Sequence, residues 1–322
     1  MNRLTSIAAI AVALTACAVH AAEQKYPTRP VRVIVTFPAG SATDIIGRVV
    51  AQKLTEYWGS NVIIDNRGGA GGSLGSAIGV KSLPDGYTLI INSSAHTINP
   101  AIYAHLPYDT LKDFVDIAPL TGTPNILVTN VASKIKTIGE FVADAKARPG
   151  KINFASAGIG SGTHLNLEKF KLVTHIDVTH IPYKGTPEAY TDIVGGRVDY
   201  YFCPLAACVP FVRDGKLRGI AVSSAKRSAL LPNVPTIAES GVPKFEFILW
   251  FGLWGPAGIP APIVGKIRAD TARALASADV RERLVTIANE PMDVKAEDFS
   301  KFVRQEIVDN ARIVKAAGIK PQ

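Results

Sequence analysis

The stretch Val31–Leu54, VRVIVTFPAGSATDIIGRVVAQKL, joins a short β-branched run, a loop of small residues and an amphipathic pattern. The run Val31–Val35 is typical of a buried strand, because it is short, apolar and rich in valine and isoleucine. After it, apolar residues recur at helical spacing from Ile45 to Leu54, and the pattern stops at Gly59. The sequence therefore predicts a strand, a tight loop and a helix.

The same alternation of strands and helices continues along the chain. Further β-branched runs predict strands at Asn61–Ile64, Thr88–Ile91, Ile126–Thr129, Val178–Ile181, Leu217–Val222 and Ile248–Trp254. A capping box at Thr137–Glu140 predicts one helix start, and Thr186-Pro187 predicts another with Thr186 as the cap. The apolar segment after Ile248 is broken by prolines, so we expect a strand followed by a helix with Pro262 in its first turn.

Length and composition favour a globular α/β protein. The chain has 322 residues, enough for two α/β domains, and 47% of them are hydrophobic. Regular β–α alternation favours parallel sheets covered by helices, and no flexible linker divides the chain. We therefore expect two α/β sheets that share a cleft, with function at the carboxyl ends of the strands.

The charge and the metal-binding residues exclude several classes of function. Lys and Arg number 35 against 27 Asp and Glu, which gives a formal charge of +8. The basic residues are scattered and form no run, so we expect no nucleic-acid partner. Histidines and cysteines show no metal-ligand spacing, so we expect neither a metal nor a cofactor.

The first 21 residues have the layout of a secretory signal peptide. A positive charge at Arg3 precedes the apolar segment Leu4–Val19, and small residues at Val19 and Ala21 mark a cleavage site. The alternative is a lipoprotein signal, in which Cys17 would carry the lipid. Both interpretations place the mature protein outside the cytoplasm.

Two cysteines remain after such cleavage, Cys203 and Cys208. Both lie in the apolar stretch Tyr200–Cys208. Their surroundings favour buried free thiols, although a disulfide between them is the open alternative.

Three loops share a composition that suits an anion-binding cleft. Phe37–Asp44, Asn92–Thr97 and Ser156–His164 are small and rich in hydroxyl groups, precede probable helices and contain neither Lys nor Arg. Glycine lets a ligand approach the backbone, and the first amides of a helix lack partners inside it. We predict that these loops hold a small carboxylate through N–H groups, hydroxyls and water. The candidate residues in them are Phe37, Pro38, Ala39, Gly40, Ser41, Asp44, Ser93, Ser94, Thr97, Ser156, Ala157, Gly158, Ser161 and His164.

Three residues in or near these loops are interpreted one by one. Asp44 would repel an anion, so we expect it to accept hydrogen bonds from backbone amides and orient its loop. His164 is either a packing imidazole or a ligand contact. Tyr183 ends a strand beside Lys184 and joins the candidate residues at the cleft.

Two rival functions come from other classes. Gly71–Gly75 matches the Gly-x-Ser-x-Gly pattern of serine hydrolases, which makes a secreted hydrolase using Ser73 the alternative. An elbow needs its serine at a sharp strand-to-helix turn, whereas seven residues separate Ser73 from the strand that ends at Asp65. An envelope protein that binds polyanions is the third possibility, and its binding would fade steeply with salt.

Eight motifs in consistent order cover nearly all of the mature chain. They are Tyr26–Pro30, Phe37–Asp44, Asn66–Gly72, Pro84–Thr88, Leu106–Asp109, Ser156–Ser161, Ile181–Gly185 and Leu231–Thr236. In them the sequence resembles the Bug-type family, the extracytoplasmic solute receptors of tripartite tricarboxylate transporters. The resemblance implies a type II periplasmic binding-protein fold, with residues 25–124 and 251–322 in one lobe and 125–250 in the other. It also implies a monomer in the periplasm with no catalysis, an organic-acid ligand and membrane transporter subunits as partners.

The resemblance also assigns the two ends of the ligand. It implies that the ligand carboxylate lies on the loops Phe37–Asp44 and Ser93–Thr97. Its other end would face Ser156–His164 and the region around Cys203, which adds Cys203 to the candidate site. This chain has Gly40-Ser41 where the family usually has two glycines. The uncharged surroundings of Cys203 favour an aromatic acid or an apolar-bodied dicarboxylate over citrate.

Overall fold

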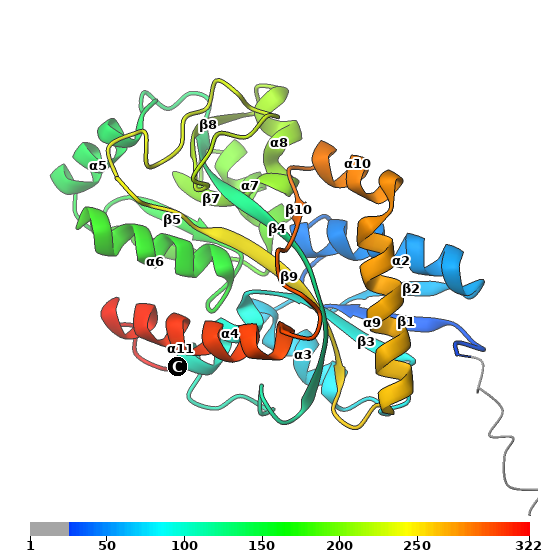
Figure 1. Ribbon diagram of the computed structural model, residues 1–322. Coiled ribbons are helices and arrows are strands. Elements are labelled where there is room, and N and C mark those ends of the chain that lie inside the picture. The colour runs from blue at the N-terminus through cyan, green and yellow to red at the C-terminus, as the bar shows by residue number, and fades with distance from the viewer. Residues whose placement is uncertain (1–25) are drawn as a thin grey trace, which may run out of the picture.

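The computed structural model describes residues 26–322 and consists of two α/β lobes (Figure 1). Ten strands pair in the order β2-β1-β3-β9-β4-β7-β5-β6, with β8 and β10 also paired to β4. The first lobe contains β1 (Val31–Val35), β2 (Val62–Asn66), β3 (Thr88–Ser93), β9 (Ile248–Pro256) and β10 (Glu290–Pro291). The second contains β5 (Asn153–Ser156), β6 (Thr179–Pro182), β7 (Tyr200–Pro204) and β8 (Leu217–Val222). The strand β4 (Phe114–Asn130) runs through both.

Helices cover both parts of the sheet. Those of the first lobe are α2 (Ala42–Trp58), α3 (Ser73–Val80), α4 (Ala95–Ile102), α9 (Ala261–Ala276), α10 (Ala278–Thr286) and α11 (Phe299–Ala316), with a short 3-10 turn, η1 (Ala70–Gly72). Those of the second are α5 (Ile138–Ala147), α6 (Gly162–Thr174), α7 (Thr186–Val194) and α8 (Leu205–Arg213). In Figure 1 the helix α11 lies along α4 below α6, so the end of the chain borders both lobes.

The expected α/β architecture is confirmed, but the expectation of purely parallel sheets is wrong. The strands β1, β2 and β3 pair in parallel, as do β5, β6 and β7. The strand β4 is antiparallel to β9 up to Pro124 and to β7 and β8 from Asn125 onward. Sequence periodicity missed the first half of β4, because Pro119, Gly122 and Pro124 interrupt its apolar pattern and the pairing shifts register there.

Each lobe has its own hydrophobic core. In the first, Val33, Ile46 and Leu253 belong to a cluster between the sheet and the helices α2 and α9. In the second lobe, Phe141 of α5, Phe170 of α6 and neighbouring aromatic side chains pack together against the strands of that lobe. Separate cores allow the lobes to move as units, because only β4 and the segments near it carry the sheet from one to the other. The residue boundaries expected for the two lobes stay a prediction.

Local signals placed most helix ends well. Gly59 ends α2 in the left-handed conformation at φ 58°, and the capping box at Thr137 is present. One expectation is wrong by a residue: Gly185 is the cap of α7, and Thr186 is its first helical residue. The Thr186 hydroxyl hydrogen-bonds to the Tyr201 hydroxyl at 3.0 Å, which explains why it is unavailable as a cap.

The long uncharged segment after Ile248 forms a buried strand and a helix, as expected. The strand is β9, and α9 begins at Ala261 with Pro262 in its first turn. Within residues 26–322, no helix combines the length and the apolar character that crossing a bilayer requires. The signal-peptide prediction and the lipid site at Cys17 lie outside the described residues.

The expectation of free thiols is contradicted, because Cys203 and Cys208 form a disulfide. Cys203 is near the end of β7 and Cys208 is in the first turns of α8, which begins at Leu205. This tight strand-to-helix turn brings their Cα atoms to 6.2 Å, within the range that a disulfide spans. Sequence composition predicted the burial of both sulfurs but not the turn that pairs them.

We expect the disulfide to be detectable as an absence of free thiol. A chain lacking residues 1–21, unfolded without reductant, should take up no iodoacetamide at Cys203 or Cys208 by mass spectrometry. The Cys203→Ser/Cys208→Ser variant should lose about 2 kcal/mol of unfolding free energy, because the short closed loop no longer restricts the unfolded chain. Alkylation of both cysteines before reduction would contradict the bond.

Candidate functional site

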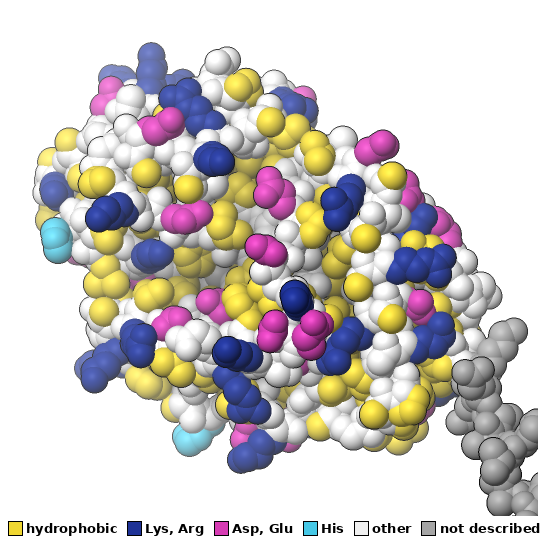
Figure 2. Space-filling model, in the orientation of Figure 1, with side chains coloured by type: hydrophobic (Ala, Val, Ile, Leu, Met, Phe, Trp, Pro, Cys, Tyr) yellow, Lys and Arg dark blue, Asp and Glu magenta, His cyan; other side chains and the backbone are white. Residues whose placement is uncertain are grey.

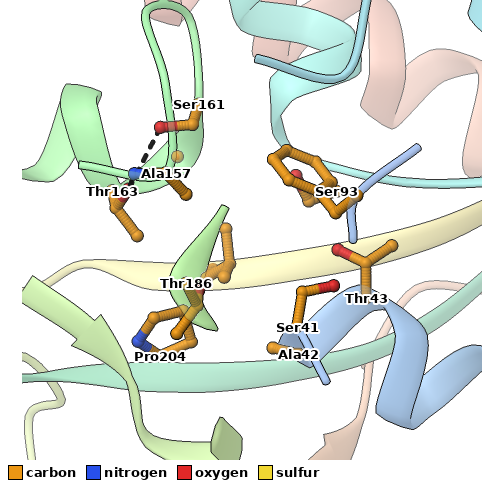
Figure 3. Close-up of a pocket in the computed structure, with 12 residues that line it drawn as sticks. Ser41, Ala42, Thr43, Ser93, Ala157, Ser161, Thr163, Thr186 and Pro204 are labelled. Atoms are coloured by element: carbon orange, nitrogen blue, oxygen red, sulfur yellow. Dashed lines mark hydrogen bonds between the residues drawn. The ribbon is translucent and has the colours of Figure 1, made fainter. Parts of the chain in front are cut away.

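A buried pocket lies between the lobes, and Figure 3 shows side chains that line it. The first lobe contributes residues from α2 and from the end of β3, and the second contributes residues from α6, α7 and β7. The lining residues are Phe37, Ser41, Ala42, Thr43, Ser93, Ala157, Ser161, Gly162, Thr163, Thr186, Pro204 and Leu249. All are neutral, so hydroxyls, backbone groups and apolar walls make up the whole lining.

The pocket is narrow in this structure. Its volume available to the centres of water molecules is about 20 Å³. That is room for one or two waters. A larger molecule therefore enters only when the two lobes separate, and the site belongs to a closed arrangement of the lobes.

Two helices begin at this pocket with nearly the same four residues. Gly40-Ser41-Ala42-Thr43 leads into α2, and Gly160-Ser161-Gly162-Thr163 leads into α6. Both serines are N-caps: the Ser41 hydroxyl accepts from the amide of Asp44 at 3.3 Å, and the Ser161 hydroxyl accepts from that of His164 at 3.2 Å. Figure 3 shows Ser41 and Thr43 on one side of the space and Ser161 and Thr163 on the other.

The caps leave the first amides of both helices for another acceptor. The first N–H groups of a helix have no carbonyl partner within it. The serine caps satisfy one donor in each helix, the amide at the third helical position. The residues at the two preceding positions, Ala42 and Thr43 in α2 and Gly162 and Thr163 in α6, line the pocket. The positive ends of two helix dipoles therefore meet at one small, uncharged space.

Two serines at the end of β3 add hydroxyl oxygen to the same place. Ser93 lines the pocket, and its hydroxyl accepts weakly from the Ala95 amide at 3.3 Å. The Ser94 hydroxyl is buried without a hydrogen-bond partner. It lies so close to Gly162 that a Cβ there would be 2.6 Å from the Ser94 oxygen. An unpaired buried hydroxyl is costly, and here it borders the pocket.

Five of the candidate residues from the sequence line the pocket, and others support it. The five are Phe37, Ser41, Ser93, Ala157 and Ser161. Asp44 accepts from the Gly40 amide and from the Asn66 amide nitrogen, both at 2.9 Å, as the sequence predicted for a loop-orienting carboxylate. The Pro38 ring packs against Gly185 of the opposite lobe, whereas Ala39 and Gly40 are exposed at the rim.

The remaining candidates are turned away from the pocket or lie behind it. Thr97 donates to the Ser94 carbonyl at 2.9 Å, and Tyr183 donates to the Asp192 carboxylate at 2.7 Å. Cys203 is taken up by its disulfide, and its neighbour Pro204 lines the pocket instead. Ser156 lies beneath the pocket loop, where its hydroxyl accepts from the Gly158 amide at 3.1 Å.

Seven lining residues were not among the candidate residues, although four of them lie within the predicted loops Phe37–Asp44 and Ser156–His164. The seven are Ala42, Thr43, Gly162, Thr163, Thr186, Pro204 and Leu249. The repeated Gly-Ser-x-Thr at two helix starts was a usable signal for four of them, because an N-cap serine fixes which amides follow it. Nothing in the sequence around Pro204 or Leu249 indicates a binding site. These residues reach the pocket only because the strands β7 and β9 bring them there in the folded protein.

The glycine-rich segment near Ser73 meets the opposite lobe. Gly71 has a φ of 56°, and a Cβ on it would overlap the carbonyl oxygen of Ile159. The Tyr103 hydroxyl donates to the same carbonyl at 3.0 Å. Only glycine permits this backbone-to-backbone approach between lobes. The turn η1 thus precedes Ser73, which begins α3 and sits on no strand-to-helix elbow, so the hydrolase alternative is not favoured.

Two stacked imidazoles hold the second-lobe loop from below. The rings of His164 and His180 stack with centroids 4.2 Å apart. The Ser156 hydroxyl and His180 Nε2 are 2.6 Å apart, and His164 Nδ1 accepts from the Gly160 amide at 3.3 Å. Burial lowers the pKa of His164 to about 3 and that of His180 to about 4, with repulsion from nearby positive charge as the second cause. Both rings are therefore neutral at pH 7.

We expect the folded state to lose stability as the pH falls from about 6.5 toward 4. In this range the unfolded chain binds protons at His164 and His180 that the folded chain does not, so unfolding is favoured by acidification. His164→Gln should flatten the slope of unfolding free energy against pH by up to about 1.4 kcal/mol per unit. Urea titrations from pH 4.5 to 7.5 measure it. The exposed His105→Gln is the matched control, and equal slopes in both variants would contradict the assignment.

Comparisons with known proteins agree on one family. The family described as "Tripartite tricarboxylate transporter family receptor" (TctC) matches residues 46–319. Protein BugT of Bordetella pertussis is 35% identical over 99% of both chains. The structure of Rpa4515 of R. palustris with adipate has a TM-score of 0.89 at 33% identity and covers 92% of this chain and 100% of that one. MatC from Rhodopseudomonas palustris with bound malate has a TM-score of 0.83 at 32% identity, over 90% of this chain and 100% of that one.

The structural comparison also settles the fold class. Periplasmic binding proteins share this arrangement of two α/β lobes, with a TM-score of 0.87 for a solved example that is 32% identical. The family match covers most of the chain, and the similarity to its relatives extends over both lobes. The chain belongs to the Bug-type receptors of the tripartite tricarboxylate transporter family.

Proposed function

We propose that the protein is a periplasmic receptor that captures a small organic acid, most suitably a dicarboxylate, between its two lobes. The observation that carries the proposal is the meeting of two capped helix N-termini at one uncharged pocket. Each helix end acts as roughly half a positive charge, so two of them together suit an acid with a carboxylate at each end. The relatives solved with adipate and with malate hold acids of this class.

Neutral donors suit a receptor that must release what it binds. When the lobes close, water is excluded, and the dipoles of amides and hydroxyls act more strongly on the carboxylates. When the lobes open, water competes for the same carboxylate oxygens. Closure and release are therefore one equilibrium, in which the acid favours a closed state because only closure lets both helix ends contact it. The lobes around a bound acid would lie further apart than in this structure, whose pocket has room for only one or two waters.

The apolar lining supports an acid with little oxygen along its carbon chain. Phe37, Ala157, Pro204 and Leu249 line the pocket and provide no hydrogen-bond partner from their side chains. A hydroxyl or third carboxylate facing them would be buried unpaired, which costs free energy. We infer that a dicarboxylate with an apolar body, or an aromatic acid, is preferred over citrate.

The proposed cellular role follows from the family. The receptor acts in the periplasm after removal of residues 1–21 and delivers its acid to membrane subunits of a tripartite tricarboxylate-type transporter. Family members are receptors, and we propose a monomer without catalytic activity. The expected turnover is zero, because Ser73 begins α3 after the glycine turn η1 and not at the strand-to-helix elbow that a hydrolase of this pattern needs.

Removing one helix amide should weaken binding directly. Ala42→Pro deletes the first N–H of α2, and the backbone tolerates it because Ser41 precedes the site with a ψ of 160°. We expect adipate or malate to bind at least about tenfold more weakly by isothermal titration calorimetry, the loss of one charge-assisted hydrogen bond.

The chain provides a matched control for this variant. Ala278 is exposed at the first position of α10 and follows Ser277, whose ψ is 145°. Ala278→Pro should therefore leave the affinity unchanged. The helix-amide site would be wrong if Ala42→Pro bound every tested acid as tightly as Ala278→Pro.

Closure should depend on the glycine contact between the lobes. Gly71→Ala would force a Cβ onto the Ile159 carbonyl, so the lobes should stay apart even with acid present. We expect small-angle X-ray scattering to show compaction of the unmodified protein with saturating acid and no compaction of the variant. Strain at a positive φ should cost the folded state only about 1 kcal/mol.

The control for closure is Gly139→Ala in α5, where an added Cβ would meet nothing within 4 Å. This variant should compact like the unmodified protein. Equal compaction of Gly71→Ala would show that the glycine contact does not limit closure.

A further inference from the structure

A second, larger hollow lies on the other face of the strand that lines the pocket. Successive side chains of a strand point to opposite faces of its sheet. Leu249 of β9 lines the pocket between the lobes, whereas its neighbours Ile248 and Trp250 line this second hollow. The two cavities are therefore separated by the thickness of a single strand.

Both lobes contribute to the second hollow, which we call the back groove. The loop 224–230 after β8 and Glu246 form one wall, and residues 285–294 with Phe302 and Glu306 form the other. Gly122 and Pro124 of β4 complete its floor. Its volume is about 810 Å³. Ligand sites commonly lie within about 300–1,000 Å³ and at the junction of two domains.

The back groove has an apolar floor and an acidic rim. Ile248, Trp250, Met292 and Phe302 supply apolar surface. The carboxylates that line it are those of Glu246, Glu290, Asp293 and Glu306. None of the four forms an ion pair within the described part of the chain. Figure 2 shows Asp and Glu side chains around the hollow between the upper and lower halves of this face, with hydrophobic side chains among them.

The cations beside the groove offset this rim only in part. Arg227 lines the groove, but its guanidinium is paired with Glu239 at 2.9 Å. Lys226 is exposed on the same wall, and Lys169 donates to the carbonyl of Glu246 at 2.7 Å. Glu306 accepts a hydrogen bond from Trp250 Nε1 at 2.8 Å, whereas Glu290 and Asp293 are exposed. The groove thus keeps carboxylates without a cationic partner on a chain whose formal charge is +8. Its complement is a ligand with positive charge and some apolar surface.

The position of the groove ties it to the state of the lobes. The pocket is on one side of β9 and the back groove on the other, with walls from both lobes on each side. If the lobes rotate about β9, which lies between the two spaces, the rotation that opens the pocket would bring the two walls of the groove together. The structure has a narrow pocket and a wide groove, so the groove is available when the receptor is closed. An occupant of the groove would stabilise that state.

We propose that the back groove is a docking site for a positively charged, partly apolar segment of a polypeptide partner, namely a membrane subunit of the transporter. The proposal rests on the receptor function argued above. Basic side chains of the segment would face the carboxylates of the rim, while its apolar side chains would cover Ile248 and Phe302. Because rotation about β9 would narrow the groove as the pocket opens, the partner would select receptors that hold an acid.

The test uses the full mature chain and a defined probe, the peptide acetyl-KLKLKLK-amide. Its affinity is measured by microscale thermophoresis with and without saturating adipate or malate. We expect tighter binding with the acid, and the peptide should raise the affinity for the acid by the same factor, because coupling is reciprocal. Glu290→Lys/Asp293→Lys should weaken peptide binding by about tenfold through lost attraction and added repulsion. The acid affinity of that variant measured without peptide should stay unchanged.

Control variants and control probes distinguish the remaining outcomes of this test. Glu282→Lys/Glu297→Lys reverses two exposed carboxylates outside the groove and should leave peptide binding intact. Equal weakening by both double variants would overturn the proposal in favour of general charge attraction. Equal binding of acetyl-QLQLQLQ-amide, or groove-dependent binding of spermidine as tight as that of the peptide, would also overturn it. Failure of acid binding in the unmodified chain would instead contradict the receptor function itself.

Discussion

The first amides of α2 and α6 impose the constraint on which the rest of the site depends. A helix cannot satisfy these N–H groups by itself, and burying them without an acceptor is costly. The serine caps hold each helix start in place but use only one donor each. What remains on both sides is a set of oriented dipoles aimed at a single small space, with neutral side chains around it. In the site that we propose, selectivity for an anion thus comes from the backbone rather than from arginine or lysine.

The crossing strands make this arrangement reversible. The helices α2 and α6 belong to different lobes with separate hydrophobic cores, so each helix start is rigid within its own lobe. The sheet continues from one lobe to the other through β4, whose register shifts near Pro119 and Gly122 on the first-lobe side. Such irregularities bend a strand locally without unfolding either lobe. We therefore propose that rotation about a few backbone positions assembles and separates the two halves of the site.

Sequence reasoning predicted the fold and the family better than it predicted which residues line the pocket. Local signals such as Gly59, the capping box at Thr137 and the prolines around α9 identified helix ends, because these effects act within a few residues. The small hydroxyl-rich loops indicated an anion site, and the family resemblance supplied the two-lobed arrangement. Pro204 and Leu249 were missed because only tertiary crossing brings them to the pocket. The free-thiol expectation failed for the same reason, since the turn between β7 and α8 is a geometric fact that composition does not encode.

The close approach of Gly71 to Ile159 has a consequence for how such receptors diversify. At Gly71 and Ile159 the two lobes meet through main chain, whereas the pocket lining includes side chains such as those of Phe37 and Leu249. Substitutions that change the size of those side chains can therefore change which acid is bound without changing how the lobes close. After gene duplication, a copy of this receptor would keep the contact between the lobes and would need to change only the side chains that line the pocket.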